Sequence, residues 1–419
     1  MELTEVKITK LVHGGQGLGE LPDGRKVFVW NGLPGETVRV RIIKTKKSFA
    51  EAIAEEVVVA SPVRVEAQES NYLATSPWQI VNFEAENEYK KDIVTECFAH
   101  EKVVLPVTGS VIHDARQWNY RNKMEYSFWG DDDGLHLALH QRGSHGKQIV
   151  TGSRLAMPAL DAAADAIVKQ LSDMGARAGD LKTLIVRTSQ SGEAVVALYT
   201  KLQQFSRLEL PKTIKGLRVY HSNPRSPASV PTALIYELGN TMLSDELLDQ
   251  TFHYDVDSFF QVNPPVFELA LQSIKSHVTE ASITDLYAGV GTIGLSVASS
   301  SVDLVELDSA TAHMAAENAA RSHISSSVVE TSAEKALEYI TSDKPVIVDP
   351  PRAGLHPSVT AHLLDVLPPK IVYLSCNPAT HARDLALLQA KYTITDFQIF
   401  NFFPRTPHIE TLAILELNK

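Results

Sequence analysis

The chain has 419 residues, 44% hydrophobic and 21% charged, which is the composition of a soluble globular protein with two or three domains. No stretch is apolar over the roughly 18 residues of a membrane helix, and the opening lacks the basic and apolar regions of a signal peptide, so we expect a cytoplasmic protein without a membrane partner. Two cysteines exclude a disulfide framework, and a net charge of −11 weighs mildly against a nucleic-acid-binding protein, because phosphate contacts need Lys and Arg.

Positive charge is concentrated near the start of the chain. Residues 1 to 50 hold nine lysines and arginines against five acidic residues, a local balance of 9 − 5 = +4. Five of these cations crowd one segment: Arg39, Arg41, Lys44, Lys46 and Lys47. The segment is either a nucleic-acid surface or a solvated strand face, and charge alone does not separate the two.

The first sixty residues predict short strands. KVFVW, ETVRVRII and EAIAEEVVVA alternate in polarity and are separated by the turn-forming GGQG, PDG and NGLPG. Several short strands in so small a span indicate a small OB-like β-barrel over residues 1–62, of the kind that binds single-stranded nucleic acid.

A linker, a helix and a mixed region follow. SPVRVEAQ resembles a linker, and helical spacing of apolar residues predicts a helix over residues 82–101 that is a candidate to pack on the C-terminal domain, with Cys97 as a packing residue. Residues 63–250 combine strand-like runs such as NKMEYSFW and AVVALYT with one helical segment, which indicates an α+β domain. Its cluster Tyr120, Arg121 and Lys123 either faces a nucleic acid or belongs to a half-exposed strand.

Residues 251–419 predict an open sheet. The runs ITDLYA, VDLVEL, SSVVET, VIVDP and IVYLSC are each followed by a helical or turn segment, as in parallel strands with crossover helices. ITDFQIF and ETLAILEL are joined only by NFFPRTPHI, which is too short for a parallel crossover, so the last strand should run antiparallel to its neighbour. Seven strands with the seventh reversed resemble the Rossmann-like α/β fold of the S-adenosylmethionine-dependent methyltransferases.

Two motifs of this region indicate a nucleoside ligand. DLYAGVGTIGL places Gly289, Gly291 and Gly294 in a G-x-G-x-x-G array between a strand and a helix, where the backbone can approach a ligand. Glu306 ends the second strand, where a carboxylate can bind both ribose hydroxyls. These two features suit NAD as well as adenosylmethionine.

Asp349 follows the fourth strand in VIVDPPRAGL. An Asp-Pro-Pro at this place is typical of enzymes that hold a flipped nucleobase beside adenosylmethionine. Asp349 could polarise a ring N–H or the methionyl amine; the alternative is an aspartate that caps a turn.

Cys376 ends the fifth strand and Glu410 begins the reversed last strand. Ligands of open α/β sheets lie outside the carboxyl ends of the parallel strands, and the beginning of a reversed strand lies at that same edge. The topology therefore predicts that a thiol and a carboxylate separated by 410 − 376 = 34 positions reach one cleft.

This pair suits methylation of a carbon in a pyrimidine. C5 of uracil is a poor nucleophile, but a thiolate that adds to C6 gives C5 carbanion character. A carboxylate can then remove the C5 proton before the thiolate leaves. We expect Cys376 to be the nucleophile, with a lowered thiol pKa, and Glu410 to be the base.

The chain resembles the RNA uracil-5-methyltransferases. LSCNPATHARDL is similar to the nucleophile motif of that family, PHIETLAIL to its general-base motif and DSFFQVNPP to a motif with a cofactor-contacting glutamine, and the segment from ITKLVHGG to VRVRI resembles the RNA-binding TRAM domain. The resemblance implies an RNA substrate, with ribosomal RNA favoured over transfer RNA, and a monomer as the default. The implied cofactor, S-adenosylmethionine, would be bound by Gln261, Tyr287, Thr292, Glu306 and Asp349.

The chain also departs from this family. Many members with a TRAM domain carry an iron–sulfur cluster on four cysteines, but ESNYLATSPWQIV, at the corresponding place, has none. We expect no cluster and no other metal, so packing alone should hold the domain of residues 63–250. The catalytic domain is expected at residues 251–419.

Two other functions stay open at this point. An adenine or cytosine N-methyltransferase uses a similar Asp-Pro-Pro turn but needs no thiol, and a noncatalytic RNA-binding protein could keep a degenerate cofactor fold. Phe259, Phe260 and Phe402 could stack on RNA bases, although aromatic residues more often belong to the core.

Overall fold

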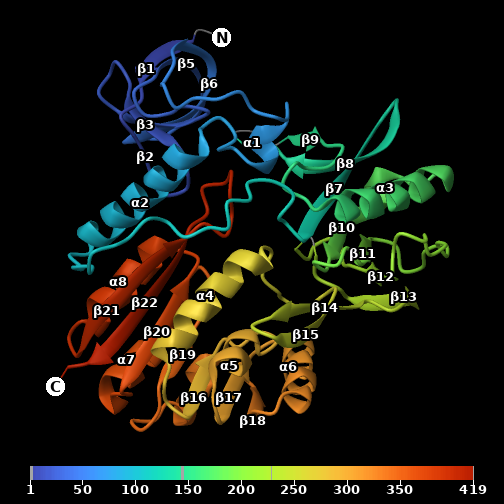
Figure 1. Ribbon diagram of the computed structural model, residues 1–419. Helices are drawn as coiled ribbons and strands as arrows, with labels where there is room; N and C mark the ends of the chain where they lie inside the picture. Colours follow the sequence, from blue (N-terminus) through green and yellow to red (C-terminus); the bar gives the residue numbers. More distant parts are fainter. Residues whose placement is uncertain (1–2, 143–145, 228, 419) are drawn as a thin grey trace.

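The computed structural model describes residues 3–142, 146–227 and 229–418, which form three parts, each built on a sheet (Figure 1). An N-terminal barrel lies above a long helix, a mixed sheet with its helix lies to one side, and a large open sheet with helices on both faces lies below. Within these ranges no helix combines the length and the apolarity of a bilayer-spanning segment.

The N-terminal barrel has the strand order β1-β5-β6-β4-β3-β2. Its strands are β1 (Thr4–Lys7), β2 (Lys10–Leu11), β3 (Gly17–Glu20), β4 (Lys26–Trp30), β5 (Thr37–Thr45) and β6 (Phe49–Val59). Alternate residues such as Val27, Val29, Val38 and Val40 are fully buried in its core. β1 also lies close against β3, because a Cβ on Gly19 would be only 2.4 Å from Val6, so the sheet curls round on itself and the predicted small barrel is confirmed.

The basic segment of the barrel is neutralised by its neighbour strand. β5 and β6 pair antiparallel, and three cations of β5 meet carboxylates of β6 in exposed ion pairs. The pairs are Arg39–Glu56 at 2.9 Å, Arg41–Glu55 at 2.7 Å and Lys44–Glu51 at 3.3 Å. Of the two interpretations that the sequence left open, the solvated strand face fits these three positions.

Helix α2 (Phe83–His100) lies between the barrel and the large sheet (Figure 1). It begins at Asn82, whose side chain accepts a hydrogen bond from the Ala85 N–H at 2.8 Å and so caps the first turn. Ile93, Val94 and Phe98 are buried against the C-terminal sheet. The predicted helix and its packing are confirmed, and Cys97 is half-buried against the same core.

The segment between barrel and α2, which includes the short helix α1 (Tyr72–Thr75), is held by polar contacts as well as by packing. Glu69 Oε1 accepts from the Arg154 N–H at 2.7 Å, and Gln79 Oε1 accepts from the Gln68 N–H at 2.9 Å. The Glu69–Arg154 bond joins this cysteine-free stretch to the central domain, so hydrogen bonds add to the packing that we expected to hold residues 63–250.

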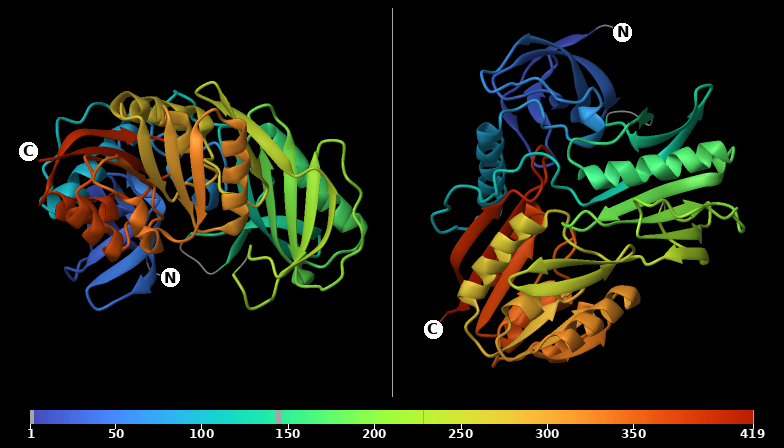
Figure 2. Two further views of the ribbon diagram at one scale, coloured as in Figure 1. Left: turned by 90° about the horizontal axis from the view of Figure 1, so that it is seen from below. Right: turned by 45° about the vertical axis from the view of Figure 1, so that its right-hand side comes forward.

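The central part is a seven-stranded sheet in the order β13-β12-β11-β10-β7-β8-β9. Figure 2 shows this sheet, in green, with a helix along one face. Helix α3 (Pro158–Asp173) covers one face through Leu160, Ile167 and Leu171, which gives the predicted α+β texture. The strands are β7 (Lys123–Asp131), β8 (Gly134–His140), β9 (Lys147–Ile149), β10 (Leu181–Thr188), β11 (Ala194–Thr200), β12 (Gly216–His221) and β13 (Ala233–Gly239).

A hairpin of β14 (Met242–Leu247) and β15 (Gln250–Asp255) connects the central and C-terminal parts. Leu243, Leu247 and Phe252 belong to the same buried cluster as helix α4 (Pro264–His277) of the C-terminal part. The expected domain limits at residues 62 and 250 stay predictions, and β14 and β15 pair across position 250.

The C-terminal part is a seven-stranded sheet in the order β18-β17-β16-β19-β20-β22-β21. β22 runs antiparallel to both neighbours, whereas the pairs from β18 to β20 are parallel, so the predicted reversed last strand is confirmed. The strands are β16 (Ser282–Leu286), β17 (Ser301–Glu306), β18 (Ser325–Glu330), β19 (Val346–Val348), β20 (Lys370–Ser375), β21 (Tyr392–Phe400) and β22 (Glu410–Leu417).

Helices cover both faces of this sheet, which explains why its central strands read as continuous apolar runs. One face packs against α4 and the other against α2, and further helices complete each layer. With α4 lie α5 (Thr292–Val297) and α6 (Ser309–Arg321), and with α2 lie α7 (Pro357–Val366) and α8 (Pro378–Leu388).

Candidate active site

The glycine-rich turn after β16 has the backbone conformation that the motif predicts. Gly289 and Gly291 have φ of 58° and 85°, and Tyr287 adopts φ 64°, a left-handed conformation that is uncommon for a residue with a side chain. A Cβ on Gly294 would lie 2.7 Å from Leu304, so this glycine lets α5 pack closely on β17. A ligand at the carboxyl edge of the sheet can therefore approach the backbone of this turn closely.

Glu306 and Asp349 face this turn from the ends of β17 and β19. The Glu306 carboxylate accepts from the Gly289 N–H at 2.9 Å and from the Asp308 N–H at 2.8 Å, which fixes its orientation. Asp349 is half-buried and has no hydrogen-bond partner in the described part of the chain; burial raises its pKa to about 7. An acid in this state suits a ligand that brings its own donor or positive charge.

Cys376 and Glu410 are brought together by strand register. Ser375 of β20 pairs with Thr411 of β22, so in an antiparallel ladder the next positions, 376 and 410, are opposite each other. Asn377 caps α8 by accepting from the Ala379 N–H at 3.1 Å, and it donates to Arg352 O at 2.9 Å. These contacts fix the turn that carries the thiol.

One cavity of about 1350 Å³ joins these groups. It is lined by six of the seven residues that the sequence selected: Gln261, Tyr287, Glu306, Asp349, Cys376 and Glu410. Thr292 does not line it: this residue is 8% exposed, on the first turn of α5, which packs against β16 and β17. Glu306 can bind ribose hydroxyls, Asp349 can meet a cationic group, and the glycine turn leaves room for the ligand. Together they fit a nucleoside cofactor with a cationic group.

The thiol pKa differs from the expectation. We expected a lowered value for Cys376, but burial, and then the carboxyl groups of Glu410 and Asp349, raise its pKa to about 12. The N-terminus of α8, two residues away, does not outweigh these effects. Burial also raises the pKa of Glu410, which is 3% exposed, well above its usual range. Burial thus favours the neutral form of both groups in the ligand-free protein.

Arg352 and His408 are functional candidates that sequence reasoning did not select. Both line the cavity, and Arg352 Nη2 donates to His408 Nδ1 at 3.1 Å. The charge of Arg352 lowers the pKa of both Cys376 and Glu410, against the larger effect of burial. Both residues could have been found from their places beside selected motifs. Arg352 follows the Asp-Pro-Pro of VDPPRAGL, and His408 stands two residues before Glu410.

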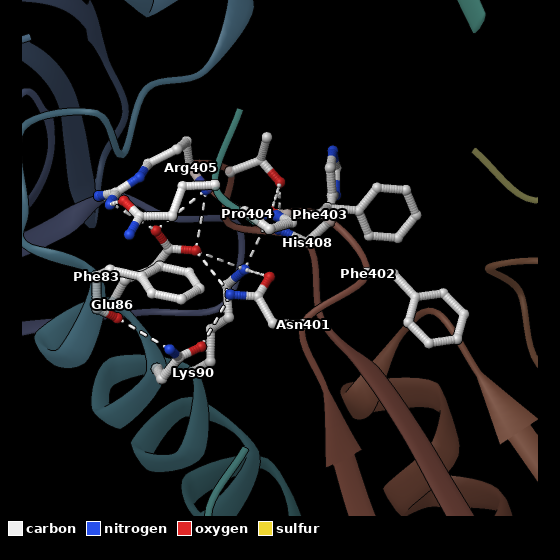
Figure 3. Close-up of polar contacts among 12 residues, drawn as sticks. Phe83, Glu86, Lys90, Asn401, Phe402, Phe403, Pro404, Arg405 and His408 are labelled. Carbon is white, nitrogen blue, oxygen red and sulfur yellow. Dashed lines mark hydrogen bonds and ion pairs between the residues drawn. The ribbon is translucent and has the colours of Figure 1, made fainter. Parts of the chain in front are cut away.

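The loop of residues 401–409, which leads into Glu410, is fastened to α2 by a buried polar network (Figure 3). Glu86 and Lys90 of α2 form an ion pair at 3.0 Å, and Lys90 Nζ donates to Asn401 Oδ1 at 2.6 Å. The Arg405 N–H donates to Glu86 Oε1 at 3.0 Å, and the Tyr120 O–H donates to Pro404 O at 2.9 Å. Tyr120 is therefore a buried support of this loop rather than a surface residue.

Only one of the three phenylalanines considered for stacking is exposed. Phe260 and Phe402 are 2% and 1% exposed and belong to the core, whereas Phe259 is 59% exposed and lines the cavity. A flat apolar ring at the rim of a nucleoside-sized cavity is suited to stack on a base.

Comparisons with known proteins agree with this geometry. The profile of the tRNA (Uracil-5-)-methyltransferase family matches residues 83–418, and that of the TRAM domain matches residues 2–54. A protein from Enterococcus faecalis described as an uncharacterized RNA methyltransferase is 30% identical over 99% of this chain and 97% of its own length. A protein of the same description from Caldanaerobacter subterraneus is 30% identical over 99% of both chains.

A crystal structure gives the same overall arrangement. It is that of the Pyrococcus abyssi tRNA (uracil-54, C5)-methyltransferase in complex with S-adenosyl-L-homocysteine, with a TM-score of 0.77, 22% identity and coverage of 98% of this chain and 100% of that one. Together the profiles and relatives show that this chain belongs to the tRNA (uracil-5-)-methyltransferase family and is an S-adenosylmethionine-dependent RNA methyltransferase with an N-terminal TRAM domain.

Proposed function

We propose that this enzyme methylates C5 of a uridine in RNA through a transient bond between Cys376 Sγ and C6 of the base. The observation that carries the proposal is the shared cavity, in which a thiol and a carboxyl group lie opposite each other beside Glu306 and Asp349. An N-methyltransferase would have no use for the thiol. Asp349, Glu306, Gln261 and Tyr287 are proposed to hold the cofactor.

The chain's own residues perform three tasks in this reaction. The Cys376 thiol first loses its proton to solvent, and the thiolate then adds to C6, so that the electrons of the C5=C6 bond move towards C5 and O4. Bound S-adenosylmethionine supplies the methyl group that C5 takes. The Glu410 carboxylate then removes the C5 proton, and the returning electron pair re-forms the C5=C6 bond and expels the thiolate.

Because the pKa values of Cys376 and Glu410 are raised, these two groups must be activated when RNA binds. Cys376 and Glu410 must both be ionised in turn, yet burial favours their neutral forms. Arg352, at the rim of the cavity, is the cation whose charge opposes burial at both groups. We infer that the entering base and the neighbouring Arg352 together favour the thiolate.

Ribosomal RNA is the proposed substrate and transfer RNA the alternative, with the enzyme acting as a cytoplasmic monomer. The TRAM domain does not decide between the two, because the Pyrococcus abyssi protein, which matches almost the whole of this chain, is described as a tRNA enzyme. Mapping of 5-methyluridine in both RNA fractions from cells with and without this protein distinguishes them.

The test uses the purified enzyme, methyl-labelled cofactor and total RNA from cells that lack the protein. Digestion to nucleosides should place the label in 5-methyluridine, and label in N-methyladenosine or N-methylcytidine would overturn the proposal. Glu410→Gln is the informative variant, because the neutral amide resembles the protonated acid and should leave the fold intact. It should form the adduct but fail to resolve it, so that protein–RNA complexes accumulate on ordinary uridine.

A further inference from the structure

The barrel touches the loop that leads into Glu410. Trp78 Nε1 donates to Gly15 O at 3.1 Å, and a Cβ on Gly15 would lie 2.3 Å from Pro407. Gly15 also has φ +95°, so both space and backbone require glycine here. The TRAM domain, the central sheet and the catalytic loop thus meet beside His408.

Arginines from two of these parts gather at this junction. The guanidinium of Arg142, just after β8, stacks over the Trp30 ring of the barrel at 4.8 Å, and Arg352 contacts His408. After desolvation, the charges of Arg352, Arg121 and Arg142 lower the pKa of His408 to about 3. Burial and the charge of Arg352 likewise lower the pKa of Arg142. The three guanidinium groups therefore lie within electrostatic reach of one imidazole.

These cations lack carboxylate partners. Across residues 3–142, 146–227 and 229–418, no Asp or Glu lies within 4.0 Å of Arg121, Arg142 or Arg352, and Arg142 Nε is buried without a hydrogen-bond partner. The buried cations Lys90 and Arg405, by contrast, are paired with Glu86. Arg121 and Arg142 are half-buried and Arg352 is exposed, so an anion from outside can reach these three positive charges and neutralise them.

We propose that Arg142, Arg121 and Arg352, with Trp30 of the barrel, bind the sugar–phosphate backbone of the RNA strand beside the flipped target nucleotide. The inference rests on the proposed function and specifies where the RNA lies. Arg352 and His408 line the catalytic cavity, whereas Arg142 and Trp30 do not, so the cluster extends from the cavity rim to the barrel. Guanidinium groups match phosphate oxygens in geometry, and backbone contacts position RNA without reading its sequence.

The barrel offers a matched control. Arg39 of β5 is an exposed arginine that is paired with Glu56 at 2.9 Å and does not line the cavity. A phosphate contact there would first have to displace a carboxylate. Arg39, which has a carboxylate partner, and Arg142, which has none among the described residues, should therefore contribute differently to RNA binding.

The experiment measures the affinity of the full chain for a fluorescein-labelled RNA hairpin with uridines in its loop, at several KCl concentrations. Arg142→Gln should weaken binding at 150 mM KCl about threefold to tenfold and reduce the slope of log K against log salt by about 0.7–0.9, as for one lost phosphate contact. Arg39→Gln should change the affinity less than twofold and leave the slope unchanged. Arg142→Lys keeps the charge and should keep most of the slope.

An unchanged slope in Arg142→Gln, or an equal loss in Arg39→Gln, would overturn the inference. If Arg142→Gln melts at a lower temperature, Arg121→Gln replaces it with the same expected loss of slope. The outcome is independent of catalysis: a wild-type protein that binds RNA as described but makes no 5-methyluridine would refute the proposed function and leave the phosphate site standing.

Discussion

Two polar clusters on the same segment of chain, residues 401–410, differ in how their charges are satisfied. In the network around Glu86, Lys90, Asn401 and Arg405, buried charges meet opposite charges and hydrogen-bond donors (Figure 3). The second cluster lies at the edge of the cavity and consists of Glu410, Cys376 and Asp349. All three groups have raised pKa values, and the only opposite charge within the cluster is the exposed Arg352. The first cluster stabilises the fold. In the second cluster the ionised forms of the side chains are unfavourable until a substrate or cofactor binds beside them.

The largest expected effect comes from removing Cys376, the proposed nucleophile at the edge of the cavity. Cys376→Ala should lower methyl transfer by at least about 10⁴-fold, because no other group can form the C6 bond. Its melting temperature should stay near that of the wild type, since the thiol is only half-buried and no other described residue hydrogen-bonds to it. Methyl transfer and thermal unfolding are measured on one preparation.

Cys97→Ala is the matched control for that variant. Cys97 is also half-buried, and burial raises its pKa to about 11, but it lies on α2 away from the cavity lining. Transfer should stay within about twofold of the wild type, as for a substitution outside the site. A large loss in Cys97→Ala would contradict the assignment of the nucleophile.

Breaking the satisfied network should instead affect stability. Lys90→Met removes the nearer cation of the buried Glu86 carboxylate, at 3.0 Å, and leaves it only Arg405 at 3.6 Å. Breaking a buried ion pair typically costs about 3–5 kcal/mol of unfolding free energy, and the remaining Arg405 should keep the loss at the lower end of that range. Chemical denaturation measures the change. The double variant Glu86→Gln/Lys90→Met removes both charges and should recover a good part of it; a double variant no more stable than the single one would mean that the ion pair is not the cause.

A smaller effect is expected on the pH dependence of cofactor binding. Burial raises the pKa of Asp349 to about 7 from its usual value of 3.8. Between these two values the folded protein keeps a proton that the unfolded chain releases. The stability that this proton contributes is lost as pH rises through about 7. A bound methionyl ammonium group favours the ionised carboxylate. Affinity for S-adenosylmethionine should therefore rise up to tenfold per pH unit below about 7 and level off above it.

Calorimetry in two buffers of different ionisation enthalpy tests this dependence. Binding near pH 6 should release close to one proton, and none near pH 8.5. Asp349→Asn should bind more weakly and without the pH dependence below 7. An affinity that is flat from pH 5.5 to 8 in the wild type would show that Asp349 does not meet the cationic group.

The sequence predicted what depends on strand order. The seven strands, the reversed β22 and the common edge of Glu306, Asp349, Cys376 and Glu410 follow from motif positions and connection lengths, because topology decides which strand ends meet. Thr292 was selected by resemblance to the motif, and its place on the first turn of α5 keeps it off the cavity wall.

The sequence did not predict what depends on contacts between distant segments. Lys90 and Asn401 are 311 positions apart, and only tertiary packing brings α2 to the catalytic loop. The raised pKa of Cys376 arises from burial in the folded protein, which a local motif does not reveal. The cations of β5 appeared available for RNA until their partners on β6 were known.

The most direct test of the central claim is covalent trapping. RNA that carries 5-fluorouridine at the target, incubated with the enzyme and S-adenosylmethionine, should give a complex that survives denaturing gel electrophoresis, because Glu410 cannot remove fluorine as a cation. Mass spectrometry should place the nucleotide on Cys376, and Cys376→Ala should give no such band. A wild-type enzyme that methylates uridine but leaves no denaturation-resistant complex, or a complex that persists in Cys376→Ala, would contradict the mechanism.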